Sequence, residues 1–119
     1  MTKFEVIKEK FIETDGETLL LSSVDDFLDI LGKCYGYNKL LIYQSNIDPI
    51  FFDLSSKLAG DILQKIVQYN IRTAFVVDLN TIKSKYFSQL VNESNSYSEY
   101  RFFENREKAE EWLLDERYD

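Results

Sequence analysis

Lys39-Leu40-Leu41-Ile42-Tyr43 is a run of strand length in which apolar and polar residues do not alternate. An unbroken apolar run of this kind indicates a strand buried on both faces, as in a parallel sheet. Thr73-Ala74-Phe75-Val76-Val77 has the same character and ends at Asp78. These two segments therefore predict neighbouring strands of a buried, mainly parallel sheet.

The segment between these strands carries the strongest helical pattern in the chain. Over residues 54–69, apolar residues recur at every fourth position: Leu54, Leu58, Ile62 and Ile66. This spacing predicts a helix over 54–69 with one apolar face. Gly60 lies within it, and we expect this glycine where the helix packs closely on the sheet.

Similar signals extend the pattern in both directions. Ser23 has Asp26 three residues later, which predicts a capped helix running to Tyr35 and stopped by Gly36. Residues 3–21 are β-rich with a turn at Asp15-Gly16, although 19–21 are compatible with a strand or a buried loop.

Beyond the second buried strand, residues 86–91 mark a third helix and residues 100–103 a last strand. Asn105 opens a final helix. The whole order is β(β)αβαβαβα, which predicts one α/β domain over residues 1–119. Its sheet would be mostly parallel and covered by about four helices through right-handed crossovers, with an antiparallel first pair at the edge.

The composition excludes most catalytic and metal chemistry. Histidine is absent, which removes imidazole acid–base catalysis, the Ser-His-Asp and Cys-His triads and imidazole zinc sites. The single cysteine, Cys34, cannot form an internal disulfide or a two-thiolate metal site, and we expect it as a small apolar helix residue. We expect no catalytic residue set, no metal and no cofactor.

The charge pattern bears on partners and location. The formal net charge is −7, which disfavours non-specific binding to nucleic acid or anionic lipid. Residues 93–119 hold nine acids and four bases. The acidic end within them, Glu104 to Asp119, is either a solvated helix face followed by a frayed terminus or the contact for a basic partner. No secretory signal and no apolar run near the ~20 residues of a membrane span occurs. We expect a cytoplasmic protein that binds neither nucleic acid nor membranes.

A distinctive string joins Phe51-Phe52-Asp53-Leu54 to Leu58-Ala59-Gly60-Asp61-Ile62-Leu63-Gln64-Lys65. It resembles the bacterial family called domain of unknown function 4180, with further matches at Glu93-Ser94-Asn95 and Glu110-Glu111-Trp112-Leu113. The resemblance covers residues 20–114. It implies a fold similar to STAS domains, the sheet-and-helix modules of anti-sigma-factor antagonists. It implies no agreed activity, substrate or catalytic set.

The first candidate site is Asp53-Leu54-Ser55-Ser56, together with Phe52. It resembles the phosphorylated Asp-Ser-Ser element of anti-sigma-factor antagonists, from which the inserted Leu54 departs. One interpretation is an interaction site with a phosphorylation switch at Ser55 or Ser56, because a helix N-terminus favours a phosphate. The other is that Asp53 or Ser55 is the N-cap of the second helix, worth about 1 kcal/mol.

Phe51 and Phe52 are two adjacent large aromatic residues in front of a predicted helix. Either one packs inward while the other is exposed beside Asp53, or both are buried. An exposed ring would suit a protein partner or a homodimer, since aromatic residues are enriched at interfaces.

The second candidate site is a polar edge after the two buried strands, formed by Gln44, Asp78 and Asn80 with Asp53 between them. Neighbouring polar residues there are Ser45, Asn46, Asp48 and Thr81. Open α/β sheets bind ligands along this edge, and Asp53 with Asp78 would make a carboxylate pair. Turn formation accounts for the same residue types.

The sequence thus favours a non-enzymatic regulatory or protein-interaction module. The alternative is a small-ligand-binding domain or weak enzyme that uses the polar edge. A flat surface with exposed Phe51 or Phe52 would favour the first function. A deep pocket among Gln44, Asp53, Asp78 and Asn80 would favour the second.

Overall fold

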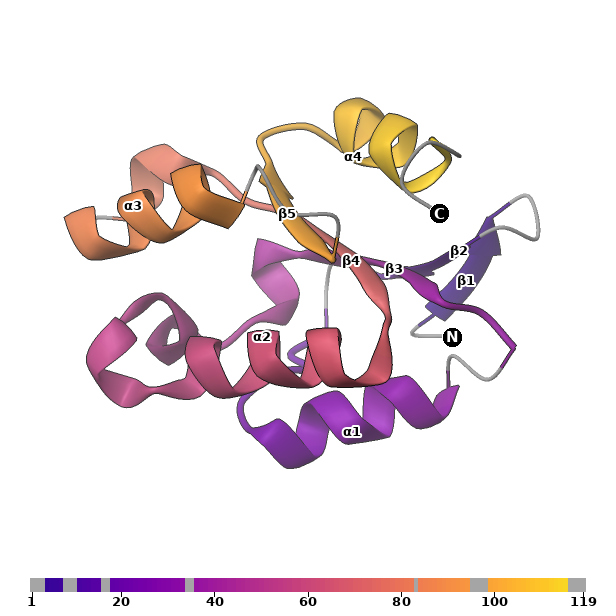
Figure 1. Ribbon diagram of the computed structural model, residues 1–119, viewed down its shortest axis with the longest axis horizontal. Coiled ribbons are helices and arrows are strands. Elements are labelled where there is room, and N and C mark those ends of the chain that lie inside the picture. Colours follow the sequence, from indigo (N-terminus) through magenta and orange to yellow (C-terminus); the bar gives the residue numbers. More distant parts are fainter. Residues whose placement is uncertain are drawn as a thin grey trace.

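A computed structural model describes residues 4–7, 11–15, 18–33, 36–82, 84–94 and 99–115 (Figure 1). The strands are β1 (Phe4–Ile7), β2 (Phe11–Thr14), β3 (Lys39–Tyr43), β4 (Arg72–Val76) and β5 (Tyr100–Phe103). The helices are α1 (Val24–Lys33), α2 (Leu58–Tyr69), α3 (Lys85–Ser94) and α4 (Arg106–Leu113). Four 3₁₀ turns join them: η1 (Gln44–Asn46), η2 (Pro49–Phe52), η3 (Leu54–Ser56) and η4 (Leu79–Thr81).

The five strands form one sheet in the order β1-β2-β3-β4-β5. β1 and β2 are antiparallel, whereas the β2–β3, β3–β4 and β4–β5 pairs are parallel. β3 pairs with β4 along its whole length, from Lys39 opposite Arg72 to Tyr43 opposite Val76. The predicted α/β class, the element order and the antiparallel pair at the edge are confirmed.

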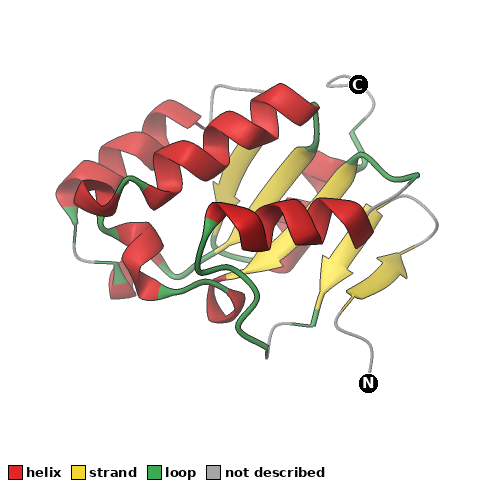
Figure 2. Ribbon diagram, turned by 90° about the horizontal axis from the view of Figure 1, so that it is seen from below, coloured by secondary structure: helices red, strands yellow, loops and turns green. Residues whose placement is uncertain are grey.

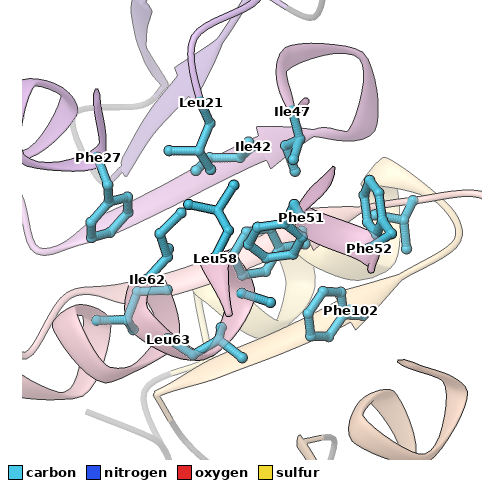
Figure 3. Packing of buried hydrophobic residues seen from close by; sticks show 14 of the residues in the cluster. Leu21, Phe27, Ile42, Ile47, Phe51, Phe52, Leu58, Ile62, Leu63 and Phe102 are labelled. Atoms are coloured by element: carbon cyan, nitrogen blue, oxygen red, sulfur yellow. The ribbon is translucent and has the colours of Figure 1, made fainter. Parts of the chain in front are cut away.

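Helices cover both faces of the sheet. Figure 2 shows α1 and α2 in front of the strands, with α4 behind them. The larger core lies under α1, α2 and α3, where Phe27 and Ile62 (Figure 3) and Phe87 are fully buried. The smaller core lies under α4 and contains Phe11 and Trp112.

Arg72 fastens the end of α4 to the sheet. Its guanidinium Nη1 donates to the carbonyl oxygens of Trp112, Leu113 and Asp115 at 3.2–3.3 Å. The guanidinium also lies 5.3 Å from the centre of the Trp112 ring. A cation at a helix C-terminus satisfies carbonyls that lack helical partners and opposes the negative end of the helix dipole. A buried arginine at the start of β4 is therefore a helix cap.

The prediction for the start of the second helix was wrong. Residues 54–56 form η3, and α2 begins only at Leu58. Lys57 separates the two with φ of 65°, in the left-handed region. The apolar period continues through Leu54, but periodicity does not detect polar side chains that bind nearby backbone groups. Such side chains compete with helical hydrogen bonds.

The prediction for Gly60 was also wrong. A Cβ atom built at this position meets no other atom within 4 Å, and the residue is exposed. The preceding residue, Ala59, is the fully buried one. Close packing of α2 on the sheet is therefore provided by alanine, one position earlier than predicted.

The first helix follows its predicted signals where the structure describes them. Ser23 Oγ accepts a hydrogen bond from the Asp26 amide at 3.1 Å, and Gly36 has φ of +87°. Tyr35 and Cys34 lie outside the described residues. By sequence, residues 19–21 are compatible with a strand or a buried loop. They form no strand, and Leu21 alone pairs with Ile47 as an isolated bridge.

Candidate functional site

A groove of about 980 Å³ opens at the carboxyl ends of β3 and β4. The two strands contribute their last residues, Tyr43 and Val76. Apolar side chains on its surface are Leu19, Ile47, Pro49, Phe52, Val76 and Ile82. Polar side chains are Tyr43, Gln44, Ser45, Asp53, Thr81 and Ser84. A concave surface that combines an apolar lining with several polar groups is typical of a ligand site.

Three aspartates shape the loops around this groove. The carboxylate of each one accepts a hydrogen bond from the backbone amide two residues later: Asp48 from Ile50, Asp53 from Ser55 and Asp78 from Asn80, all at 3.0 Å. Each aspartate thereby caps a 3₁₀ turn, namely η2, η3 and η4. The carboxylates at this edge therefore stabilise turns, which is the second explanation for these residue types in the sequence analysis.

The turns at Asp53 and Asp78 are alike in sequence and geometry. The first reads Asp-Leu-Ser-Ser and the second Asp-Leu-Asn-Thr. Their aspartates have φ and ψ of −98° and 104° and of −97° and 101°. In each turn the last hydroxyl, from Ser56 or Thr81, donates to the aspartate carbonyl at 2.8 Å. Only Asp53 of these two aspartates lines the groove.

Asp53 is exposed and ionised. The Ser55 hydroxyl and amide both donate to its Oδ1, at 2.7 and 3.0 Å. These hydrogen bonds, the one from the hydroxyl first, hold the pKa of Asp53 below its ordinary value. The predicted N-cap at Asp53 therefore exists, but it caps η3 and not the second helix.

Ser56 is the last residue of η3, two positions before α2 begins. Its Oγ accepts a hydrogen bond from the Leu58 amide at 3.2 Å, and it donates toward the Ile50 and Asp53 carbonyls at 2.7 and 2.8 Å. Ser55 is also exposed, and its hydroxyl contacts Asp53. The two serines of the predicted interaction site therefore differ: the Ser55 hydroxyl contacts a side chain, whereas the Ser56 hydroxyl contacts backbone groups.

Gln44 connects the end of β3 to the loop after β4. Its side-chain carbonyl accepts from the Asp78 amide at 2.7 Å, and its side-chain nitrogen donates to Thr81 Oγ1 at 2.9 Å. The structure therefore brings together Gln44, Asp78 and Asn80, the predicted ligand edge. Of the four residues expected around a pocket, Gln44 and Asp53 line the groove, whereas Asp78 and Asn80 are not among its lining residues.

Asn46 belongs to the interior and not to the ligand edge. It is fully buried, and its side-chain oxygen accepts from the Thr14 hydroxyl at 2.6 Å and the Tyr43 amide at 3.1 Å. Its side-chain nitrogen donates to the Thr18 carbonyl at 2.8 Å and to Asp15 at 3.2 Å. These four bonds connect the ends of β2 and β3, so Asn46 supports the groove from behind.

Both aromatic residues in front of the second helix are buried, Phe51 fully and Phe52 to 9% exposure. Phe52 packs edge-on against Phe51 (Figure 3), with ring centres 5.2 Å apart, and against Phe87, with ring centres 5.1 Å apart. Of the two alternatives for this pair, the buried one is correct. Among the exposed large apolar residues, Leu19 lines the groove, and Ile50 lies in η2 beside the lining residue Pro49.

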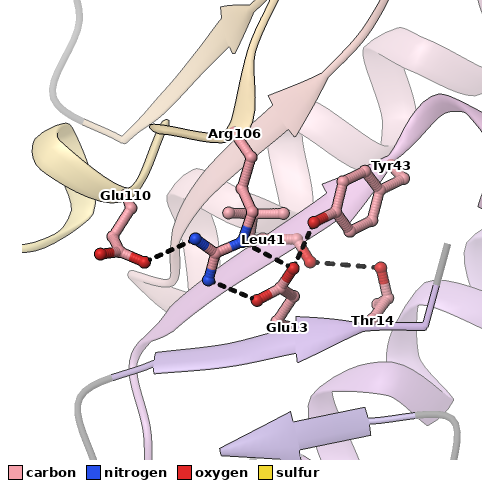
Figure 4. A network of polar contacts seen from close by, with 6 residues as sticks. All are labelled: Glu13, Thr14, Leu41, Tyr43, Arg106 and Glu110. Carbon is pink, nitrogen blue, oxygen red and sulfur yellow. Dashed lines mark hydrogen bonds and ion pairs between the residues drawn. The ribbon is translucent and has the colours of Figure 1, made fainter. Parts of the chain in front are cut away.

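A charged network missed by the sequence analysis lies behind Tyr43 (Figure 4). Arg106 donates to both carboxylate oxygens of Glu13, at 2.9 and 2.8 Å, and pairs with Glu110 at 2.8 Å. The Tyr43 hydroxyl donates to the same Glu13 carboxylate. The one sequence signal was a charged residue two positions after Phe11, on the same face of a strand.

The network changes how its members ionise. Partial burial acts to raise the pKa of Glu13, but hydrogen bonds from Arg106 and Tyr43 outweigh it and hold that pKa below its ordinary value. Partial burial and the hydrogen bond to Glu13 raise the pKa of Tyr43 to about 12. Glu13 is therefore a carboxylate and Tyr43 a neutral phenol near neutral pH.

Two negative findings concern the part of the chain that the structure describes. No group of three acidic or thiol side chains there could hold a metal ion. No helix there is long and apolar enough to cross a membrane.

Comparison with known proteins identifies the family of the chain. A family model described as domain of unknown function, DUF4180, matches residues 7–113. The match extends further toward the N-terminus than the resemblance of residues 20–114 predicted. Neither the curated proteins nor the solved structures contain a match to the chain.

Proposed function

Because the chain belongs to the family described as domain of unknown function 4180, a description that states no activity, we propose its function from the groove. The protein is a non-catalytic domain that binds a small ligand with an apolar body at the carboxyl edge of its parallel sheet. This is the alternative in which Gln44 and Asp53 serve a ligand site.

The observation that carries this proposal is the mixed lining of the groove. Its volume of about 980 Å³ falls within the usual range for small-molecule sites, roughly 300–1,000 Å³. Phe52 and Ile82 are both 9% exposed and offer apolar surface, and the polar groups lie along the strand ends. Since the strand order has no reversal, the crevice arises from the turns η1 to η4 and not from a topological switch point.

The absence of histidine supports binding without catalysis. Asp53 and Asp78 each cap their own turn, and one of them lines the groove. A carboxylate pair working on a common substrate therefore has no support from this arrangement.

Binding of Nile red, a neutral apolar dye that fluoresces when it leaves water, tests the proposal. The full chain is expected to bind the dye, and the exposed Ser45 at the groove offers a place to block it. Ser45→Trp should weaken binding about tenfold, the effect of losing ~1.4 kcal/mol of contact. Gln64→Trp adds the same side chain on the exposed face of α2 and should bind as the unmodified protein does.

If the dye does not bind, or binds equally well to both tryptophan variants, the groove is not the ligand site. Backbone NMR shifts on adding the dye provide a second measurement. They should concentrate at the ends of β3 and β4, and shifts centred elsewhere would contradict the proposal.

A second candidate is the regulatory protein-interaction module, acting in the cytoplasm of a bacterium as a STAS-like protein or as a homodimer. The observation that favours it is that exposed Ser55 lies in η3, next to the turn of exposed Ile50. Phosphate on Ser55 or Ser56 would add charge beside Phe52 and Asp53 and alter docking there. Mass spectrometry of the protein purified from its own host tests this, and consistently unmodified serines would count against the switch.

A further inference from the structure

Most polar groups in the groove already have hydrogen-bond partners inside the protein. The Gln44 side chain uses its oxygen for the Asp78 amide and its nitrogen for Thr81. The Thr81 hydroxyl accepts from Gln44 and donates to the Asp78 carbonyl. The Tyr43 hydroxyl donates its proton to Glu13. A ligand therefore finds few free donors among these three side chains.

Asp53 is different. Both hydrogen bonds from Ser55 go to Oδ1, and within the described residues Oδ2 accepts none. Asp53 is exposed, and it is the one formally charged side chain among the described residues that line the groove. A carboxylate is an acceptor only, so its partner must be a hydrogen-bond donor, and a cationic donor gives the stronger bond.

The rest of the lining suits the other parts of such a ligand. The Phe52 and Tyr43 rings line the same groove as Asp53, and aromatic rings attract cations as well as apolar groups. Leu19, exposed to 58%, offers apolar surface at the groove without any charge.

We propose that the ligand is an organic cation: an amine whose ammonium group pairs with Asp53 and whose apolar body lies against Phe52 and Leu19. This inference rests on the proposed function, because it names the class of ligand that the same groove takes. The Glu13 carboxylate behind Tyr43 does not compete for the amine, since Arg106 occupies both of its oxygens.

Three probes with the same phenyl body separate charge from apolar contact: 2-phenylethylamine, 2-phenylethanol and 3-phenylpropanoate. Their ability to displace Nile red from the full chain is compared at neutral pH and low salt. The amine should displace the dye at about three- to tenfold lower concentration than the alcohol, as an exposed ion pair allows. The carboxylate should be the weakest of the three.

Asp53→Asn removes the charge and keeps a side chain that caps a turn equally well. It should bring the amine to the level of the alcohol when both probes displace Nile red from this same variant. Asp78→Asn is the matched control, because Asp78 caps an equivalent turn but does not line the groove. It should leave the preference for the amine unchanged.

The results distinguish failure of the cation inference from failure of the ligand site itself. If Nile red binds in the groove but the amine and alcohol displace it equally, or the carboxylate is strongest, the inference of a cation is wrong and the ligand site stands. If Nile red does not bind in the groove, both fail. Should Asp53→Asn not fold, salt gives the same information on the unmodified chain, since added salt should weaken displacement by the amine and not by the alcohol.

Discussion

Arg106 and Glu13 are separated by 93 positions in the chain, yet they make two parallel hydrogen bonds of 2.9 and 2.8 Å. Arg106 is the first residue of α4, and Glu13 belongs to β2. The pair therefore fixes the start of α4 on the sheet, while Arg72 fixes its end. Bidentate geometry of this kind combines strength with a defined orientation.

Replacing Glu13 should destabilise the protein. Glu13→Gln removes the charged partner of Arg106 and Tyr43, and the free energy of unfolding should fall by about 1–3 kcal/mol. Urea unfolding followed by circular dichroism measures this. Glu107→Gln, at an exposed position of α4, is the control and should change stability by less than about 0.5 kcal/mol. Equal losses in the two variants would mean that the pair does not hold α4.

The same carboxylate predicts a pH dependence. The pKa of Glu13 lies below the ordinary value of 4.5 in the folded protein, so the unfolded chain binds the proton more tightly. Its contribution is therefore present above that ordinary pKa and is lost as pH falls through the lower folded pKa. The stability difference between the unmodified protein and Glu13→Gln should shrink between about pH 7 and about pH 3. A difference that grows on acidification would contradict this sign.

Asn46 and Asn80 should respond very differently to truncation. Asn46→Ala removes a partner of the buried Thr14 hydroxyl and of the half-buried Thr18 carbonyl, and should cost about 2–4 kcal/mol in urea unfolding. Asn80 is exposed, and its backbone amide makes the bond to Asp78. Asn80→Ala should therefore cost less than about 0.5 kcal/mol. Similar losses would show that the Asn46 network is not a support of the groove.

The two serines of η3 should also differ. Ser56→Ala removes the hydroxyl that accepts from the Leu58 amide and reaches the Ile50 carbonyl, which should cost about 1 kcal/mol. Ser55→Ala removes an exposed hydroxyl bound to Asp53 and should cost less. Thermal unfolding of both variants in parallel checks the order, and a larger loss for Ser55→Ala would contradict it.

Two glycines should give opposite results on substitution by alanine. Gly60→Ala should stabilise the protein by about 0.5–1 kcal/mol, because the site is helical and has open space for a Cβ atom. Gly36→Ala should destabilise it by about 1–2 kcal/mol, because φ is +87° there. Melting temperatures of the two variants provide the measurement. Destabilisation by Gly60→Ala would mean that glycine serves some purpose in α2 other than packing.

Much of the fold could be predicted because its signals are local. The apolar runs of β3 and β4 and the Asn105 cap of α4 each lie within a few residues. The break at Lys57 was not predictable in this way, because a left-handed residue there carries no apolar signature. The apolar periodicity therefore extends to Leu54, on the N-terminal side of the first residue of α2.

The edge at which the polar side chains of the candidate site gather could be predicted, but their contacts could not. Turn-forming aspartates and Gln44 identify the carboxyl edge, since polar residues after buried strands must lie there. That Phe52 is buried depends on Phe87, which lies in α3 and comes much later in the sequence. For the Glu13–Arg106 pair, the sequence signals only a charged residue on the same strand face as Phe11, because nothing in either segment specifies the partner.

The strand order has a consequence for how the protein is made. Every strand lies beside the strand that precedes it in the chain. Each pairing can therefore form as soon as its segment leaves the ribosome, with no insertion between strands already joined. Burial of the sheet face under α4 is the exception, because Phe11 and Leu41 pack against residues of this last helix. Until residues 106–113 are synthesised, that face is open to chaperones and to other nascent chains.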